Sequence, residues 1–304
     1  MRRPTLLAVF VWLLSGCDDG TRCGTGAFDA SLGLCTCPDA ADPASRCELP
    51  RDAFDVEAHR GARSTLPPGN TLPAFVEAIR LGADTLEGDL RLTLDRRVVL
   101  SHDATLASEC VYAGDGPAPP TRVIAELLAS DVDRFDCHPS IDGVDAPPRL
   151  EAVLDLRTRA NVRFDLELKE TAAPDVDTAM QAFVAYDAAC GGCLAGLLQI
   201  ESFSAEALVQ ARASYGAMLA CDVSSLVTAT VDDPAWVASF ADVYSPMYVG
   251  VTEELVRAYH AAGVRVLPWT VDQDATMCEL VRLGVDGLIS DDPALLGQTY
   301  ARCR

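Results

Sequence analysis

The sequence predicts an α/β fold of the (β/α)8 barrel type, in which eight parallel strands alternate with helices. Eight short apolar segments with strand character follow Phe54, and most are separated by a segment of helical length. The chain has 304 residues, which suits one large α/β domain. An open doubly wound sheet is the alternative, but no Gly-x-Gly-x-x-Gly sequence opens a helix to support it.

The first expected elements are a strand, a capped helix and a hairpin, over residues 55–60, 70–81 and 84–103. Asn70 or Thr71 would cap the helix. A turn at 95–97 separates the arms of the hairpin, 84–92 and 98–103.

Residues 104–149 interrupt the alternation. They are rich in Pro, Gly and Asp, with a short helix expected near 123–130, so we expect a small insertion after the second strand, followed by a helix over 150–159. The remaining strands are expected over 162–169, 196–203, 217–223, 242–248, 265–271 and 286–290.

One strand has an apolar face and a charged face. Its inward residues, by a period of two, are Arg163, Asp165, Glu167 and Lys169. Charges inside a barrel are costly unless they are paired or bind a metal. We expect Arg163 and Asp165, near the barrel floor, to pair with neighbouring groups. We expect Glu167 and Lys169 to belong to a site at the other end, with simple pairing as the alternative.

Histidines bracket two acids earlier in the chain. Glu87 and Asp89 share one face of the second strand, with His59 and Arg60 before them and His102 after them. A half-exposed strand would also carry acids on one face, but the histidines favour a functional site.

Three carboxylates are therefore expected to converge, from Glu87, Asp89 and Glu167 on adjacent strands. Such oxygens suit one hard divalent cation, Ca²⁺ or Mg²⁺, better than zinc. The formal charge is −21, with 45 acidic and 24 basic residues, which argues against nucleic acid as a partner. A phosphate-bearing small substrate would need such a local cation.

The N-terminus has the form of a secretory signal over residues 1–16. Two arginines precede an apolar run over 4–14 that is too short to span a bilayer, which takes about 20 residues. The sequence Leu14-Ser15-Gly16-Cys17 resembles a bacterial lipobox, so we expect lipidated Cys17, with plain cleavage as the alternative. We then expect an exported protein, periplasmic or at the cell surface, that meets the membrane only through its lipid anchor.

The 12 cysteines predict disulfides in an exported protein. Besides Cys17, four of them lie in residues 17–50, the expected tether before the barrel domain of 51–304, and are Cys23, Cys35, Cys37 and Cys47. Two disulfides are expected there, and a zinc site is the alternative, although no Cys-x2-Cys pair occurs in that segment.

Seven further cysteines lie in the barrel domain, and their odd number leaves one thiol over. The expected pairs are Cys110 with Cys137, Cys278 with Cys303, and Cys221 with Cys190 or Cys193.

Several short motifs occur in a characteristic order: His59-Arg60-Gly61, Asn70-Thr71, Ala74-Phe75, Gly82-Ala83-Asp84, Glu87-x-Asp89, His102-Asp103, Glu167-Leu168-Lys169, Trp269-Thr270-Val271-Asp272 and Val285-Asp286-Gly287-Leu288-Ile289-Ser290-Asp291. In order and spacing they resemble the glycerophosphodiester phosphodiesterase family over residues 54–293, least in 104–149. The resemblance implies a metal-dependent barrel hydrolase that splits glycerophosphodiesters into glycerol 3-phosphate and an alcohol.

The resemblance also implies roles for individual residues. The matching positions would hold the cation at Glu87, Asp89 and Glu167, move protons at His59 and His102, and bind phosphate at Arg60 and Lys169. One departure is Gly69, where the family usually has Glu, so any ligand or hydrogen bond from that side chain is absent.

The chemistry of a phosphodiester leads to the same residues. Its negative charge must be neutralised, which a cation with Arg60 and Lys169 would do. Its leaving alkoxide must be protonated, for which we expect His59 and His102 as the acid and base, without assigning which is which. Water and a neighbouring substrate hydroxyl both stay open as the nucleophile.

Other residues are weaker candidates. Trp269 is expected to wall the pocket against the glycerol or alcohol, with core packing as the alternative. His138 is expected in a surface loop, and His260 on the outside of the barrel. Asp291 would cap the last helix or support the site. Two other functions stay open: a phospholipase D type activity on lysophospholipids or sphingomyelin, and a lipid-anchored binding protein without turnover.

Overall fold

The computed structural model describes residues 54–139, 143–228 and 233–304, and the backbone of two short strands before them. These strands, β1 (Ala27–Asp29) and β2 (Leu34–Thr36), pair antiparallel. The signal peptide, Cys17 and the four tether side chains Cys23, Cys35, Cys37 and Cys47 lie outside the described residues. The domain division at residues 16 and 50 therefore stays a prediction. Among the described helices, none is both long enough and apolar enough to cross a membrane.

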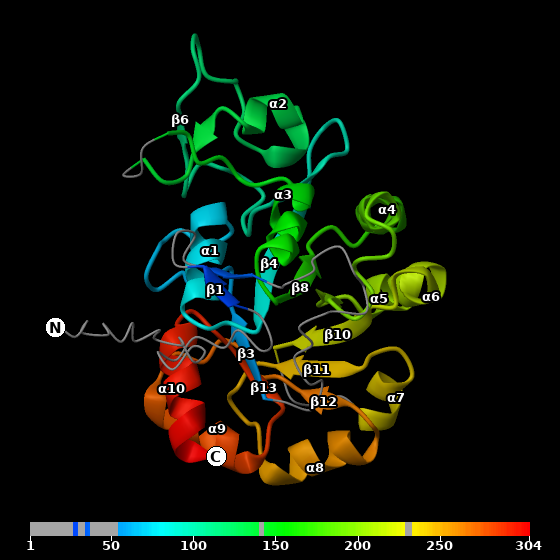
Figure 1. Ribbon diagram of the computed structural model, residues 1–304. Coiled ribbons are helices and arrows are strands. Elements are labelled where there is room, and N and C mark those ends of the chain that lie inside the picture. Colours follow the sequence, from blue (N-terminus) through cyan, green and yellow to red (C-terminus); the bar gives the residue numbers. More distant parts are fainter. Residues whose placement is uncertain (1–26, 30–33, 37–53, 140–142, 229–232) are drawn as a thin grey trace, which may run out of the picture.

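Eight parallel strands form the predicted barrel (Figure 1), in the order β12-β11-β10-β9-β8-β4-β3-β13. They are β3 (Asp55–Ala58), β4 (Thr85–Leu92), β8 (Arg163–Leu168), β9 (Leu198–Ser202), β10 (Asp222–Val227), β11 (Val243–Pro246), β12 (Arg265–Val266) and β13 (Gly287–Ser290). Backbone bonds of 2.9–3.0 Å between residues 266–271 and 286–289 close the ring from β12 to β13.

Helices surround the barrel, one after each strand or its insertion: α1 (Leu72–Arg80), α3 (Leu150–Leu154), α4 (Ala173–Ala189), α5 (Ala205–Ala211), α7 (Pro234–Ala238), α8 (Glu253–Ala261), α9 (Asp274–Leu283) and α10 (Pro293–Cys303). Thr71 caps α1 through its hydroxyl, so the second of the two predicted caps is the one used. The main core lies between strands and helices and contains the outward residues of β8, Phe164, Leu166 and Leu168. The predicted two faces of this strand are thereby confirmed.

The barrel floor contains two charge pairs, of which the one at Arg163 was predicted. Arg163 contacts Asp55 at 2.8 Å, and Arg265 contacts Asp222 at 2.9 Å. Both arginines line a cavity of about 270 Å³ at the N-terminal ends of the strands. Because their charges are already balanced by carboxylates, this cavity is a polar floor and not the predicted site.

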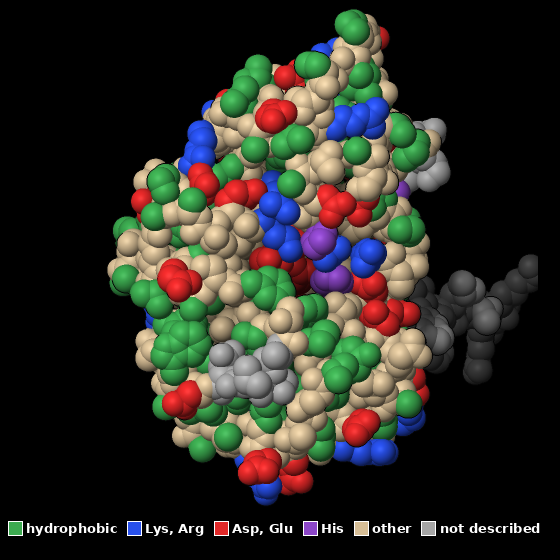
Figure 2. Space-filling view, turned by 180° about the vertical axis from the view of Figure 1, so that it is seen from behind, with side chains coloured by type: hydrophobic (Ala, Val, Ile, Leu, Met, Phe, Trp, Pro, Cys, Tyr) green, Lys and Arg blue, Asp and Glu red, His purple; other side chains and the backbone are tan. Residues whose placement is uncertain are grey.

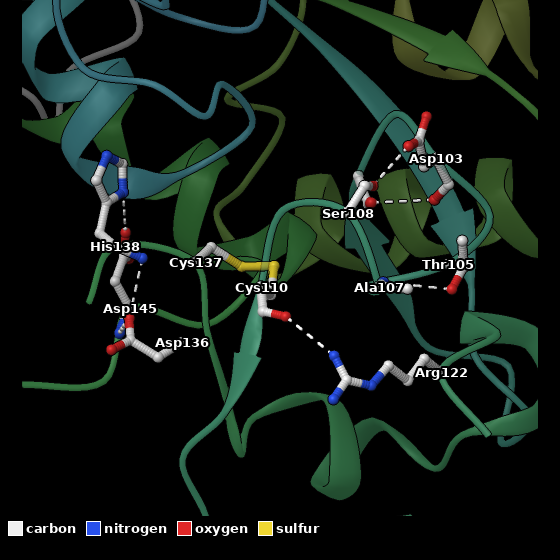
Figure 3. Close-up of a disulfide and its surroundings, with 11 residues drawn as sticks. Asp103, Thr105, Ala107, Ser108, Cys110, Arg122, Asp136, Cys137, His138 and Asp145 are labelled. Carbon is white, nitrogen blue, oxygen red and sulfur yellow. Dashed lines mark hydrogen bonds and ion pairs between the residues drawn. A yellow bond between two sulfur atoms is a disulfide. The ribbon is translucent and has the colours of Figure 1, made fainter. Parts of the chain in front are cut away.

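The predicted insertion follows β4 and its hairpin partner β5 (Val98–Leu100). It contains β6 (Val111–Tyr112), η1 (Ile124–Glu126), α2 (Ala129–Val132) and β7 (Phe135–Asp136). Figure 1 shows it above one end of the barrel. It has a small apolar core of its own, closed by the predicted Cys110–Cys137 disulfide (Figure 3).

The prediction that His138 lies in a surface loop is wrong. Its side chain is buried in the insertion, because Nδ1 hydrogen-bonds Asp145 at 2.9 Å and its backbone N–H donates to Asp136 (Figure 3). His260, as predicted, lies on the outside, where it contacts Asp286 at 2.8 Å.

One predicted strand is displaced along the chain. Residues 217–219 are helical, as α6 (Ala217–Leu219), which continues α5 through the π-helical turn η3 (Arg212–Gly216). Ala, Met and Leu are strong helix formers, and the helix ends only where Ala220 takes φ 48°. The strand β10 therefore begins at Asp222 and runs to Val227.

Two of the other cysteine predictions have different outcomes. Cys278 and Cys303 form the expected disulfide. The expected pairing of Cys221 is wrong, because Cys190 and Cys193 bond to each other across two glycines and leave Cys221 as a free thiol. Both glycines have positive φ, which lets the chain turn tightly enough to join them.

Candidate active site

The predicted site residues lie at the C-terminal ends of neighbouring strands, where barrel enzymes bind their substrates. Figure 2 shows acidic, basic and histidine side chains gathered around a hollow, with hydrophobic side chains along its edge. Asp89 of β4 is in register with Glu167 of β8, and Glu87 is in register with Asp165. This pairing brings residues almost eighty positions apart to the same side of the barrel interior.

Three buried carboxylates converge as predicted. One oxygen from each of Glu87, Asp89 and Glu167 lies within 4.8 Å of the others. Burial, with the nearby charge of Asp89, raises the pKa of Glu87 well above its ordinary value. Burial also raises the pKa of Glu167 to about 7. Glu87 and Glu167 therefore bind protons more tightly than exposed glutamates do, because burial disfavours their charged forms.

Two cationic side chains contact the same carboxylates. The ammonium of Lys169 lies 2.8 Å from Asp89 and 2.5 Å from Glu167, and the Nε of Arg60 lies 3.0 Å from Asp89. Although burial opposes its ionisation, these two cations hold the pKa of Asp89 below its ordinary value. Arg60 has φ 56°, and its backbone N–H donates to Glu87 at 2.8 Å. The predicted phosphate-binding groups are thus placed beside the predicted metal ligands.

His59 lies just after β3 and is oriented by an acid from the other end of the chain. Its Nδ1 is 2.6 Å from Asp291, which also contacts Arg63 at 3.3 Å. Burial lowers the pKa of His59, while the hydrogen bond to Asp291 raises it. The next residue, Asp292, caps α10 instead. Asp291 therefore supports the site, which is one of its two predicted roles.

His102 follows β5 and also contacts an acid through Nδ1. Asp103 lies 2.8 Å away and accepts a further bond from Ser108 at 2.8 Å. The hydrogen bond from His102 is the main cause of a lowered pKa for Asp103. In both His59 and His102, Nδ1 is occupied by a carboxylate, so Nε2 is the nitrogen left for a substrate.

Asn70 contacts the acidic cluster, although the sequence predicted for it only a possible helix cap and a place in the Asn70-Thr71 motif. Its amide donates to Asp89 at 2.6 Å, and its oxygen accepts the Asp89 backbone N–H at 3.0 Å. A side chain at Gly69 would place its Cβ 2.4 Å from the Cβ of Arg60 and 2.7 Å from the Arg60 carbonyl oxygen. Gly69 therefore permits this close backbone approach, and no larger residue fits without a shift.

Trp269 packs against a second aromatic residue, Phe203, and its role as a wall of the pocket stays a prediction. Trp269 donates its indole N–H to Ser245 at 2.7 Å and packs edge-on against Phe203, with ring centroids 5.6 Å apart. Phe203 directly follows β9 and is 49% exposed. Trp269 is partly exposed, so it is not a residue of the closed core. The sequence reading missed Phe203, although its position after a strand was a usable signal.

Three further acids lie inside the barrel and were not singled out as site residues. Burial raises the pKa of Glu57 and Glu201 well above the ordinary value, and that of Asp165 to about 6. Both carboxylate oxygens of Glu57, and one oxygen each of Asp165 and Glu201, have no hydrogen-bond partner among the described residues. When protonated, these three carboxyl groups carry no charge, so they need no further cations to balance them.

A second group of metal-ligating residues exists on the outside of the barrel, at Asp187, Cys190 and Cys193. The two sulfur atoms are joined in a disulfide, so they are not available as thiolate ligands.

Comparison with known proteins gives a consistent result. The family model described as glycerophosphoryl diester phosphodiesterase family matches residues 59–295. A glycerophosphodiester phosphodiesterase of Caldanaerobacter subterraneus subsp. tengcongensis is 27% identical over 249 residues, covering 79% of this chain and 95% of the relative. One of Bacillus altitudinis is 28% identical over 256 residues, covering 78% and 94%.

A solved structure has the same fold. It is an Oleispira antarctica phosphodiesterase in complex with the product sn-glycerol-3-phosphate, with a TM-score of 0.68 and 21% identity. The match covers 81% of this chain and 96% of that one.

Proposed function

Because this chain belongs to the glycerophosphoryl diester phosphodiesterase family, we propose that it is a metal-dependent phosphodiesterase that hydrolyses glycerophosphodiesters to glycerol 3-phosphate and an alcohol. One observation carries the proposal. Three buried carboxylates and two cationic side chains share one end of the barrel with two histidines, each held by an aspartate. This combination can hold a phosphodiester, balance its charge and move protons.

The acids fit a divalent cation, which we propose to be one Ca²⁺ or Mg²⁺ held by Glu87, Asp89 and Glu167. Their ligand atoms are all hard oxygens within 4.8 Å of one another, and all three side chains are buried. When bound, a divalent cation supplies Lewis-acid polarisation of a phosphoryl oxygen.

The substrate phosphate is assigned to Arg60 and Lys169. Both lie beside the acidic cluster, and the two together would balance the charge that builds on the phosphoryl oxygens during the reaction. The glycerol or alcohol is assigned to the wall formed by Trp269 and Phe203.

Proton transfer is assigned to His59 and His102. Each Nδ1 is bonded to an aspartate, which fixes the ring and leaves Nε2 free to take or give a proton. One would activate the attacking oxygen, and the other would protonate the leaving alkoxide.

The experiment is an assay of the purified protein on glycerophosphocholine and glycerophosphoethanolamine with Ca²⁺, Mg²⁺ or EDTA. We expect release of glycerol 3-phosphate that EDTA abolishes and that either His59→Ala or His102→Ala lowers by about 10² to 10⁴. Near-parental turnover of both folded variants would refute the acid–base assignment. A cyclic glycerol phosphate would identify the substrate hydroxyl as the nucleophile.

A phospholipase D type activity on lysophospholipids or sphingomyelin is a second candidate. The exposed ring of Phe203 favours it, because an apolar surface beside the phosphate-binding groups could receive an acyl-bearing group. Lysophosphatidylcholine in the same assay separates the two. No turnover of any of these substrates, with metal bound, would instead indicate a binding protein.

We also propose that the protein is exported and lipid-anchored through Cys17, on the strength of the lipobox-like sequence. Expression of the full chain in a bacterium should give a membrane-bound product that Cys17→Ala releases into the soluble periplasmic fraction.

A further inference from the structure

We propose that Arg91 and Glu170 are positioning residues that hold His102 in place for proton transfer, a proposal that rests on the role assigned to His102 above. Arg91 lies on the inward face of β4, two residues after Asp89. Glu170 directly follows Lys169 at the end of β8. The two residues therefore stand at the mouth of the barrel, on the strands that carry the acidic cluster.

The guanidinium of Arg91 joins Glu170 to His102. Its Nη1 lies 3.1 Å from a Glu170 carboxylate oxygen, and its Nη2 donates to the His102 carbonyl at 2.6 Å. The side chains of Arg91 and Glu170 are both partly buried, so solvent screens this ion pair less than it would on the surface. The Nε of Arg91 is buried without a partner among the described residues. Glu170 and the His102 carbonyl are thus the contacts that orient this guanidinium.

His102 needs an anchor outside its own segment. It lies between β5 and the insertion, its side chain is 39% exposed, and the acid that orients its ring is the adjacent Asp103. A neighbour in the chain moves with His102, so Asp103 sets the ring orientation but not the distance to the barrel. The Ser101 backbone N–H donates to the Asp89 carbonyl at 2.9 Å and holds this segment to β4. The hydrogen bond from Arg91 to the His102 carbonyl is a further contact between the segment and β4.

Loss of the Arg91 tie should displace the imidazole from the reacting oxygen. A misplacement of about 1 Å costs roughly 100-fold in rate. We expect Arg91→Gln to lower kcat by about 10- to 100-fold and to change KM for glycerophosphocholine by less than about threefold. Glu170→Gln keeps an oxygen that accepts from Arg91 and should cause a smaller loss in the same direction.

The decisive test combines Arg91→Gln with His102→Ala. If Arg91 acts through His102, the double variant should be no slower than His102→Ala alone. A loss of the same size in both backgrounds, or a raised KM with unchanged kcat, would overturn the proposal and indicate that Arg91 contacts the substrate. Arg80→Gln is the matched control, because it breaks an Arg–Glu pair on the exposed face of α1 and should leave both constants unchanged.

A second readout does not depend on activity. The ¹³Cε1 resonance of His102, identified by its loss in His102→Ala, should shift in Arg91→Gln and Arg91→Lys but not in Arg80→Gln. An unchanged resonance in folded Arg91 variants contradicts the positioning role. Absence of phosphodiesterase activity in the parent protein would instead contradict the proposed function, while the resonance still decides the role of Arg91.

Discussion

The contact between His59 and Asp291 allows a sharp test of the acid–base assignment. The two residues lie 232 positions apart in the sequence, near the start and the end of the barrel domain. In the folded protein, Nδ1 of His59 lies 2.6 Å from a carboxylate oxygen of Asp291. Asp291→Asn removes the charge but keeps the size and an oxygen that can accept from Nδ1. The variant therefore tests the electrostatic support of His59 with little change in packing.

The size of the effect follows from this hydrogen bond. A bond to a charged group contributes about 1.5–3 kcal/mol, which corresponds to roughly a 10- to 150-fold change in rate if it is all lost in the transition state. Because asparagine retains one acceptor oxygen, we expect a loss in kcat/KM at the lower end of this range, about 10- to 30-fold.

The dependence of kcat/KM on pH should also change in a defined direction. Burial lowers the pKa of His59, while the hydrogen bond and charge of Asp291 raise it. Removal of the charge should therefore lower this pKa further. If His59 acts as the base, the acidic limb of kcat/KM moves to lower pH, and if it acts as the acid, the basic limb does.

The measurement is kcat/KM for glycerophosphocholine between about pH 5 and 9, which spans the ordinary pKa of histidine. Asp286→Asn is the control, since Asp286 pairs with His260 at 2.8 Å on the outside of the barrel and should leave both limbs in place. An unchanged rate and profile in Asp291→Asn, or a limb that moves to higher pH, would refute the reasoning.

Three further predictions concern the metal, the insertion and the altered motif. Burial raises the pKa of Glu167 to about 7, so protons compete with the cation for this carboxylate. The affinity for Mg²⁺ or Ca²⁺, measured by calorimetry, should therefore weaken as the pH falls below about 7. Glu167→Gln should remove binding at every pH. Replacing Cys110 and Cys137 by serine should lower the free energy of unfolding by about 3–4 kcal/mol. Residues 104–149 should then become the first site of limited proteolysis, while the helicity of the barrel measured by circular dichroism stays unchanged. A variant as resistant to protease as the parent would contradict this. Gly69→Ala should lower both the melting temperature and kcat, because its Cβ would lie 2.4 Å from that of Arg60, and a variant as active and stable as the parent would show that this segment shifts freely.

The barrel and most of its acid–base chemistry could be predicted from local patterns. Alternation along β8 placed Asp165 and Glu167 inside, and the register with β4 confirms this placement. The displaced strand at 217–223 shows where such patterns fail. Residues 217–219 are apolar enough for either structure, and the preceding helix and Ala220 decide the outcome.

Buried polar partners were harder to predict than their elements. His138 was expected in a surface loop because it lies in the insertion, yet it is buried against Asp145. Asn70 looked like a cap because Asn often precedes helices, yet its amide holds Asp89 from two sides. The partner of His138 lies seven residues away and that of Asn70 lies nineteen, so the folded backbone, and not the immediate sequence neighbours, brings each pair together.

The sequence by itself determined the fold class, the insertion after the second strand and the set of acidic, basic and histidine residues, because periodicity and residue chemistry are local properties. Only the tertiary structure decided which acid holds which histidine, that Cys190 bonds Cys193 and leaves Cys221 free, and that Arg91 reaches the His102 carbonyl. The contact between His59 and Asp291 joins strand ends 232 positions apart, and it exists only once the barrel closes. Strand register, closure and backbone turns, not sequence spacing, set which side chains meet.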